Sequence, residues 1–244
     1  MSRRFEQESG EAVSRPVCLI TGVGPGTGAA LVRRFAERYD VAMLARDRER
    51  LEALSAEVAS ARAYACDVTE PGRLGTVLDA VGEEMGSPEV LVHNAVGGAW
   101  GAVLDVDPEI LLRNFRVNAI ALLHLIQALG PEMVARGQGA ILATGNTAAY
   151  RGSKGFSAFA PTKAAQRILL ESAARELGPK GVHVAYVAID AVIDVPWTRE
   201  AMADKPDEFF AAPRDIAEEC FRIAHQPRSA WSFETVLRPF GESW

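Results

Sequence analysis

The 244-residue sequence predicts one α/β domain, a doubly wound and mostly parallel seven-stranded sheet with helices on both faces. Three observations support this fold class. Short apolar runs alternate with segments whose apolar residues recur at helical spacing; no internal repeat or low-complexity linker interrupts the alternation; and hydrophobic residues make up 48% of the chain, enough for a sizeable core. We therefore expect a flexible polar tail over residues 1–15 and a single domain over residues 16–244.

The expected strands are short apolar runs, each bounded by polar or glycine-containing segments. In chain order they are Pro16–Thr21, Val41–Ala45, Ala63–Asp67, Val90–Ala95, Ala140–Thr144, Val182–Ile189 and Ser232–Leu237. The segments between them place apolar residues on one helix face, as in Leu51, Leu54 and Val58 and in Leu74, Val77, Leu78 and Val81. Each such helix returns the chain to the same end of the sheet, so neighbouring strands are expected to run parallel.

Two of the expected helices are apolar over more of their circumference than one sheet-facing stripe needs. They cover Leu111–Leu129 and the alanine-rich Phe156–Leu177. The surplus favours an interface between copies of the chain, so we expect a homodimer or homotetramer through the helices around 109–129 and 156–177. The alternative is that these helices lie more deeply within their own subunit.

Charge and hydropathy exclude several classes of partner. The formal net charge is −6, which argues against nucleic acid and against an anionic membrane surface. The longest apolar run, Ala119–Leu129, is interrupted by His124 and Gln127 and is too short to span a bilayer. The polar N-terminal residues contain no apolar core of a signal sequence. We expect a cytoplasmic protein with a small-molecule substrate.

The three cysteines and four histidines are scattered through the sequence, with neither a disulfide framework nor a zinc-ligand spacing. Cys18 and Cys66 lie in apolar runs, where a buried, unreactive thiol is expected. We expect no metal site.

A glycine-rich segment follows the first expected strand and runs into a helix that begins near Ala29. Glycines permit positive φ and let backbone N–H groups approach a pyrophosphate, which the positive end of the helix attracts. At the first strand–helix junction of an α/β chain, this pattern predicts a Rossmann-like dinucleotide site. The expected cofactor-binding residues here are Thr21, Gly22, Gly24, Gly26, Thr27 and Gly28.

Arg46 bears on the choice of cofactor. A carboxylate at the end of the second strand would accept hydrogen bonds from a ribose 2′-hydroxyl and repel a 2′-phosphate. Ala45 holds that place, and Arg46 follows with a guanidinium able to bind a phosphate. The sequence therefore favours NADP(H) over NAD(H); the alternative is an Arg46 that merely faces solvent.

The segment Thr21-Gly22-x-x-x-Gly26-x-Gly28 resembles the glycine motif of the short-chain dehydrogenase/reductase family, and further motifs follow in the family's order. The resemblance implies an oxidoreductase that transfers a hydride with a nicotinamide cofactor. It also implies cofactor contacts from Asp67, Val68, Asn94, Ala95 and Lys163 and a place for Asn118 in the proton relay. His93 replaces the first Asn of the family's Asn-Asn-Ala-Gly motif, and Val96 replaces its Gly.

The catalytic pattern of the family is broken in two places. Phe159 stands at the Tyr of the Tyr-x-x-x-Lys motif, four residues before Lys163. Asn146 stands thirteen residues before Phe159, where the family has a Ser that contacts the substrate oxygen. The amide of Asn146 and the hydroxyl of the adjacent Thr147 can still donate hydrogen bonds, but a phenyl ring has no proton to give. Loss of a general acid costs about 10²–10⁴-fold in rate, so reduction of a simple ketone should be slow.

Three replacements for the missing tyrosine are open. Lys163 could supply the proton through Asn118 and a water; Tyr150 could enter the site from its loop; or the substrate's own chemistry could remove the need for the acid. Dienoyl-CoA reductases of the same superfamily also lack this tyrosine, so its loss does not by itself indicate inactivity.

The sequence departs from the family again after the sixth expected strand. The usual Pro-Gly and following Thr are replaced in a segment that carries Asp190 and Asp194, and the backbone of Val192 is expected to face the nicotinamide. An unpaired acid there would oppose a pyrophosphate. Pro196–Ala212 is expected to form either a lid over an apolar pocket or a surface helix.

Two hypotheses for function follow from these residues. The first is an NADP(H)-dependent oxidoreductase with an altered proton relay, whose substrate is a small carbonyl or alcohol or an activated C=C compound. The second is a catalytically inactive NAD(P)-binding sensor or scaffold protein.

Overall fold

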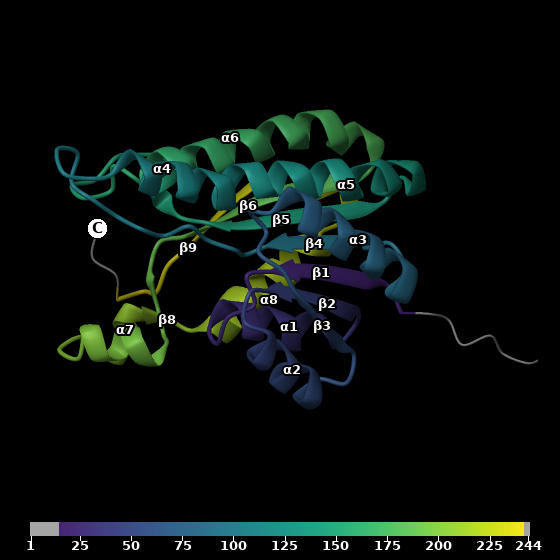
Figure 1. Ribbon diagram of the computed structural model, residues 1–244, viewed down its shortest axis with the longest axis horizontal. Coiled ribbons are helices and arrows are strands. Elements are labelled where there is room, and N and C mark those ends of the chain that lie inside the picture. The colour runs from purple at the N-terminus through teal and green to yellow at the C-terminus, as the bar shows by residue number, and fades with distance from the viewer. Residues whose placement is uncertain (1–14, 242–244) are drawn as a thin grey trace, which may run out of the picture.

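The computed structural model describes residues 15–241 and contains a central seven-stranded sheet with the strand order β3-β2-β1-β4-β5-β6-β9 (Figure 1). The strands are all parallel to their neighbours. They are β1 (Val17–Thr21), β2 (Asp40–Ala45), β3 (Ala61–Ala65), β4 (Val90–His93), β5 (Gly139–Gly145), β6 (Val182–Ile189) and β9 (Glu234–Leu237). The predicted α/β class and doubly wound parallel sheet are confirmed. The flexible tail expected over residues 1–15 lies almost entirely outside the described residues.

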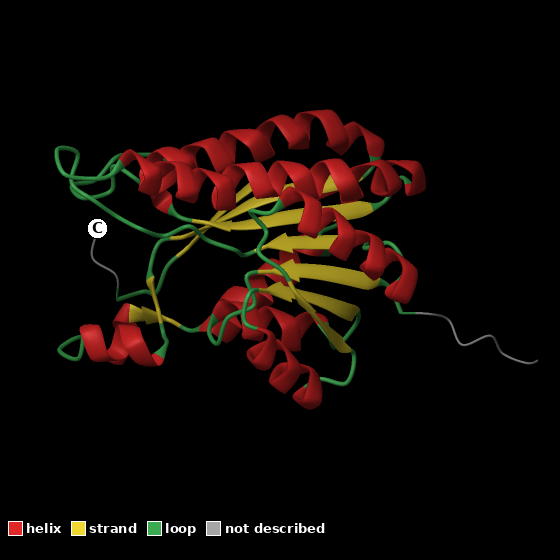
Figure 2. Cartoon of the chain, in the orientation of Figure 1, coloured by secondary structure: helices red, strands yellow, loops and turns green. Residues whose placement is uncertain are grey.

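Helices cover both faces of the sheet (Figure 2). On one face α1 (Thr27–Phe35), α2 (Arg48–Glu57) and α8 (Pro213–Ala224) enclose one hydrophobic core. On the other face α3 (Pro71–Met85), α5 (Ala121–Arg136) and α6 (Ala160–Leu177) enclose a second core. Burial of both faces explains why the strands are nearly continuous apolar runs.

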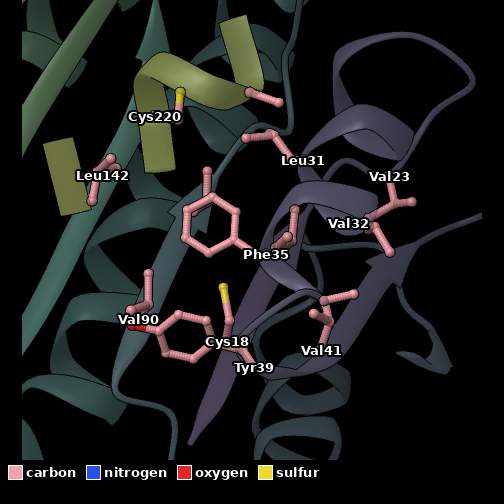
Figure 3. Packing of buried hydrophobic residues seen from close by; sticks show 14 of the residues in the cluster. Cys18, Val23, Leu31, Val32, Phe35, Tyr39, Val41, Val90, Leu142 and Cys220 are labelled. Carbon is pink, nitrogen blue, oxygen red and sulfur yellow. The ribbon is translucent and has the colours of Figure 1, made fainter. Parts of the chain in front are cut away.

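Figure 3 shows the first core from close by, with the Phe35 ring of α1 between the sheet and α8. Cys18 of β1 and Cys220 of α8 are both fully buried in this core, and burial raises the pKa of both thiols. Buried thiols with raised pKa values are weak nucleophiles. Cys18 and Cys220 therefore act as small apolar residues, as the sequence predicts for Cys18.

The longest helical stretch is continuous from residue 108 to residue 136. It consists of α4 (Pro108–Phe115), a π-helical turn over Arg116–Ile120, and α5. By length and composition alone it qualifies as a membrane span, but 44% of its most apolar window is buried inside the fold. A core helix gives the same signal, and α5 packs on the sheet through fully buried Leu122 and Leu125.

Several element boundaries differ from the sequence-based expectation. The third strand lies at Ala61–Ala65 and not at Ala63–Asp67, because its register pairs Ala61 with Val41 of β2. The helix expected over Phe156–Leu177 begins at Ala160, where Pro161 is suited to the first turn. The expected lid segment Pro196–Ala212 divides into α7 (Pro196–Ala201), a short 3₁₀ turn and β8 (Phe210–Ala211), which pairs with β7 (Val192–Ile193).

Candidate functional site

A cleft of about 780 Å³ lies at the carboxyl ends of β1, β2, β3 and β4. The chain leaves β1 toward β2 on one side, while β4 continues the sheet on the other. Such a reversal of strand order opens a crevice between the loops that follow the strands. The cleft is lined by the glycine-rich loop, by Arg46, by Asp67 and Val68, by residues 94–99, and by Ile193, Val195 and Trp197.

The glycine-rich loop is held tightly against the loop that follows β4. Gly22 has φ +70°, and a Cβ placed on it would lie 2.4 Å from the backbone nitrogen of Ala95. A Cβ on Gly28 would lie 2.6 Å from the carbonyl oxygen of Gly22. Glycine is therefore required at both positions. At Gly22 the reasons are the positive φ and the close packing, and at Gly28 the reason is close packing alone. Gly24 differs, because a Cβ there would meet open space.

The hydroxyl of Thr27 identifies where an anion would bind. Thr27 is the first residue of α1, its side chain is buried, and its Oγ1 has no hydrogen-bond partner among the described residues. A buried hydroxyl without a partner is destabilising, whereas at a helix N-terminus it can donate to a phosphate oxygen. The glycine-rich loop thus fits the pyrophosphate of a dinucleotide.

The opposite end of the cleft carries the residues expected at the adenosine. The Asp67 carboxylate accepts hydrogen bonds from the backbone and the hydroxyl of Thr69, at 2.9 and 2.7 Å, which fixes its orientation. Arg46 lines the cleft, and no ion pair among residues 15–241 engages its guanidinium. Arg50 also lines the cleft and pairs with Asp47 at 3.0 Å.

Asn94 joins three loops at the centre of the cleft. Its Nδ2 donates to the carbonyl of Gly22 at 2.8 Å, and its Oδ1 accepts from the Thr144 hydroxyl at 2.9 Å. The side chain therefore connects the ends of β1, β4 and β5. Asn94 and Ala95 both line the cleft, as the sequence predicts for cofactor-binding residues.

His93 forms a second buried link beside Asn94. Its Nδ1 lies 3.0 Å from the Thr21 hydroxyl and its Nε2 lies 3.1 Å from the carbonyl oxygen of Val117. The carbonyl can only accept, so Nε2 carries the proton and Nδ1 accepts from Thr21. Burial, together with the charge of Lys163, lowers the pKa of His93 to about 3, so the imidazole is neutral.

Two buried asparagines hold the loop after β4. Asn118, in the π-helical turn, exchanges hydrogen bonds of 2.9 Å with both backbone groups of Gly97 and donates to the Thr162 hydroxyl at 2.8 Å. Asn114 donates to the carbonyls of Ala99 and Ala158, both at 2.8 Å. The structure thus places Asn118 in a positioning role at the boundary between the cleft and α6.

Lys163 points into the interior from the first turns of α6. Its Nζ donates to Oε1 of Gln166 at 2.8 Å and to the carbonyl oxygen of Thr144 at 3.4 Å. The side chain is only 2% exposed, and burial lowers the pKa of Lys163 to about 7. The amine therefore exchanges its proton with water near neutral pH.

Phe159 occupies the tyrosine position of the motif and is 7% exposed. It packs with Ala148 and Ala160, and the Lys163 Nζ lies 5.8 Å from its ring centroid. Its ring meets that of Phe156 edge to face at 6.0 Å. Phe159 thus forms part of an apolar wall in front of the lysine.

The polar side chains expected to replace the family serine already have partners. Nδ2 of Asn146 donates to the Ile189 carbonyl at 2.9 Å, and its Oδ1 accepts from the backbone of Ala148 at 2.8 Å. The Thr147 hydroxyl donates to Asp190. Asn146 and Thr147 are therefore held in place by the ends of β5 and β6.

Tyr150 lies on the outer side of this loop. Its ring centroid is 5.5 Å from the Arg167 guanidinium, and Arg167 also forms an ion pair with Glu234. Burial and the nearby negative charge of Glu234 raise the pKa of Tyr150 to about 12. Tyr150 thus lies beside Arg167 and Glu234.

The two acids that replace family residues after β6 are both neutralised. Asp190 pairs with Arg238 at 3.1 Å. Asp194 receives two hydrogen bonds from Arg199, at 2.7 and 2.9 Å, which lower its pKa. Pairing with arginine removes the repulsion that an isolated carboxylate would exert on a pyrophosphate.

The segment after β7 lies against the glycine-rich loop. A Cβ on Gly26 would lie 2.7 Å from Cγ1 of Val195, and Trp197 lines the cleft with 70% of its surface exposed. Val192 forms part of β7, next to Ile193 of the cleft wall. The segment after β7 therefore borders the cleft beside the glycine-rich loop.

Sequence reasoning missed Gln166 and Asn114. Gln166 lies three residues after Lys163 on one helix face, and this spacing could have predicted their contact. No local motif predicts the hydrogen bonds of Asn114, because its partners Ala99 and Ala158 are distant in sequence. No group of metal-binding side chains occurs within residues 15–241.

The fold and cleft define the class of the protein: an α/β protein of the Rossmann type with a dinucleotide cleft. The chain belongs to the short chain dehydrogenase family, whose model matches residues 16–205.

Two relatives indicate the range of sequence similarity. The 7alpha-hydroxysteroid dehydrogenase of Escherichia coli strain K12 is 26% identical over 239 residues, covering 91% of this chain and 92% of that protein. Short-chain dehydrogenase reductase 4 of Arabidopsis thaliana is 33% identical over 177 residues, covering 70% and 59%.

Solved structures give the same assignment. A metagenomic short-chain oxidoreductase in complex with NADP matches with a TM-score of 0.80 and 27% identity, covering 93% of this chain and 98% of that one. An NAD⁺-bound xylitol dehydrogenase shares the fold, with a TM-score of 0.83 at 22% identity, covering 94% and 100%. The neighbours thus include complexes with both nicotinamide dinucleotides.

Proposed function

We propose that the protein is an NADP(H)-dependent oxidoreductase with an altered proton relay. It transfers a hydride to or from a small carbonyl, alcohol or activated C=C compound in the cytoplasm. A bound nicotinamide dinucleotide supplies or accepts that hydride. Membership of the short chain dehydrogenase family supports the reaction class.

The observation that carries this proposal is the buried, unpartnered hydroxyl of Thr27 in the glycine-rich loop. With the first turn of α1 it would hold the pyrophosphate, while Asp67 and Val68 lie at the adenine end and Asn94 lies at the centre of the same cleft. A site that had lost its ligand would be expected to satisfy or replace such a hydroxyl, because leaving it unpaired costs about 1–3 kcal/mol.

Arg46 supports the preference for NADP(H). Its guanidinium lines the cleft at the end of β2, and an arginine fork can bind the 2′-phosphate that distinguishes NADP(H). The preceding Ala45 offers no carboxylate to a 2′-hydroxyl.

In the altered relay Lys163 exchanges the proton, and Asn118 and Asn146 position the loops beside it. Lys163 has a pKa near neutrality, so it can take up and release a proton at working pH. Asn118 fixes the loop of residues 97–99, and Asn146 fixes the loop after β5. Phe159 takes no part in proton transfer.

A second candidate function is a sensor or scaffold that binds the dinucleotide without turnover. One observation favours it: the Lys163 Nζ already donates hydrogen bonds within the protein, to Gln166 and to the Thr144 carbonyl.

Turnover assays separate the two candidates. Wild type and Phe159→Tyr are assayed with NADPH and a panel of aldehydes, ketones and enones, after NADPH binding has been confirmed for each by calorimetry. The oxidoreductase proposal expects turnover by wild type on part of the panel and a gain of about 10²–10⁴-fold on ketones in Phe159→Tyr. Binding without turnover by either protein would contradict it.

The same proposal includes a homodimer or homotetramer. Leu112 of α4, Ile120 of the π-helical turn and Ile168 of α6 are exposed on the two helices predicted to form an interface. Analytical ultracentrifugation tests this, and a monomer at micromolar concentration would contradict it.

A further inference from the structure

Three aromatic rings form a continuous stack that begins at the position of the missing tyrosine. Phe159 meets Phe156 edge to face at 6.0 Å, and Phe156 stacks on Trp100 at 5.2 Å with an interplanar angle of 16°. The two loops that carry these rings are joined by backbone hydrogen bonds between Gly101 and Gly155 at 2.8 Å and between Ser157 and Gly101 at 3.3 Å. The stack is thus built into the fold.

The outer end of the stack lies beside the cleft. Trp100 directly follows Ala99, which lines the cleft, and 64% of its surface is exposed. Trp197 lines the cleft from the opposite segment and is 70% exposed. Large exposed aromatic faces next to a cleft favour a flat apolar ligand, because stacking buries both faces at little entropic cost.

The polar side chains near Phe159 are committed to other partners. Thr147 donates to Asp190, Tyr150 lies beside Glu234, and the Lys163 Nζ donates to Gln166. A substrate oxygen at this wall would therefore meet rings and not an acid in position to protonate it.

Without an acid beside the substrate oxygen, the anion that hydride addition creates is not protonated at once. The site therefore favours substrates that give a weakly basic anion. Addition to the carbonyl carbon of a simple ketone creates an alkoxide, about as basic as hydroxide, whose conjugate acid has a pKa of about 15.7. Addition to the β-carbon of a conjugated enone creates an enolate, whose delocalised charge makes its oxygen about as basic as that of a phenolate, with a pKa of about 10. The oxygen of the second anion therefore depends less on a general acid in the transition state.

We propose that the substrate is a flat, apolar α,β-unsaturated carbonyl compound in conjugation with an aromatic ring, and that the exposed ring of Trp100, backed by Phe156 and the buried Phe159, binds it. This proposal rests on the proposed oxidoreductase function. A C–H bond forms at the β-carbon with the hydride and its electron pair from the reduced coenzyme, which is oxidised. The C=C π bond breaks, its electron pair moves to give the enolate, and the α-carbon takes a proton from a water molecule, which Lys163 reprotonates. The product is the saturated ketone.

Benzylideneacetone and its saturated counterpart benzylacetone test the reaction, because they share one carbon frame and differ only in the conjugated double bond. With wild type and NADPH deuterated at C4, we expect benzylideneacetone to be consumed at least about 100-fold faster than benzylacetone. Deuterium should appear at the β-carbon, with benzylacetone as the final product. In Phe159→Tyr the ratio of the two rates should fall at least tenfold as alcohol begins to form. Phe221→Tyr, which adds a hydroxyl on α8 at the other face of the sheet, should keep the wild-type ratio.

A binding measurement, which does not depend on turnover, supplies a second test. By calorimetry in the presence of NADP⁺, benzylideneacetone should bind at least fivefold more tightly than benzylacetone. Trp100→Ala should abolish that difference, whereas Leu104→Ala, an exposed aliphatic truncation in the same loop, should retain it.

The outcomes distinguish this proposal from the function on which it rests. If wild type reduces benzylacetone as fast as benzylideneacetone, or binds the two equally, the substrate class is wrong and the oxidoreductase function stands. If neither compound is consumed although NADPH binds, the substrate class is contradicted, and the panel of aldehydes, ketones and enones decides separately whether the oxidoreductase function stands.

Discussion

At the scale of single residues, the site combines retained binding groups with a replaced reaction centre. Thr27 has a buried hydroxyl with no partner among the described residues, which a bound dinucleotide would supply, and Asn94 joins the loops that line the cleft. Phe159 has no polar group, and Lys163 behind it is held by Gln166. Motif spacing identified each of these residues except Gln166, but spacing alone could not show that the amide of Asn146 has partners on both sides. Such contacts depend on where β5 and β6 end relative to each other.

Arg46 is expected to determine coenzyme preference. Arg46→Ala removes the only guanidinium proposed for the 2′-phosphate, and charge-assisted hydrogen bonds contribute about 1.5–3 kcal/mol. The affinity for NADPH should fall at least tenfold, while that for NADH should change less than threefold, both measured by calorimetry. Arg48→Ala serves as the matched control, since Arg48 pairs with Glu52 on the exposed face of α2. Equal loss of NADPH and NADH affinity would count against a phosphate-specific role.

His93 is expected to make the fold acid-sensitive. Its pKa is about 3 in the folded protein against 6.5 in the unfolded chain, so the unfolded state binds more protons between these values. Stability should therefore fall as pH drops from 6.5 toward 3, by up to about 3 kcal/mol at pH 4 from this residue.

His93→Asn, which introduces the family residue, should flatten this dependence in urea-unfolding curves recorded between pH 4 and pH 7. His124→Asn is the control, because His124 lies on α5 and takes no part in the hydrogen bonds of His93 to Thr21 and Val117. A similar flattening in both variants would show that His93 is not the source.

At the scale of elements, helix and strand types were predictable from apolar spacing, but their ends were set by contacts between elements. β3 starts two residues earlier than its apolar run because Ala61 pairs with Val41. The π-helical turn of Arg116–Ile120 has no sequence signal, yet it carries Asn118 to Gly97 and Thr162. The β7–β8 pair could not be predicted, since each strand has only two residues and their pairing is long-range.

The packing of the glycine-rich loop on the loop after β4 gives a prediction at this scale. Gly22→Ala must strain a backbone at φ +70° and move Ala95, so it should destabilise the protein by more than about 1 kcal/mol and abolish coenzyme binding. Gly72→Ala, in the first turn of α3 with open space around its Cβ, should leave binding intact and raise stability slightly. Thermal unfolding and calorimetry measure both effects. Normal coenzyme binding by Gly22→Ala would show that the close approach of the two loops is not required.

At the scale of the whole molecule, the alternation of strands and helices was sufficient to predict a doubly wound sheet, and the family followed from motif order. Function is less determined by the fold, since the same architecture supports many substrates. What is particular to this chain is that a cleft lined by the glycine-rich loop occurs together with an aromatic stack that begins at the tyrosine position of the family motif. The central claim is that the cleft still binds its coenzyme.

The most direct test of that claim is a calorimetric titration of the wild-type protein with NADPH and, separately, with NADH. We predict one binding site per chain, a dissociation constant for NADPH in the micromolar range or below, and at least tenfold weaker binding of NADH. Absence of binding by both dinucleotides would contradict the account, because it would leave the glycine-rich loop and the buried Thr27 hydroxyl without a ligand.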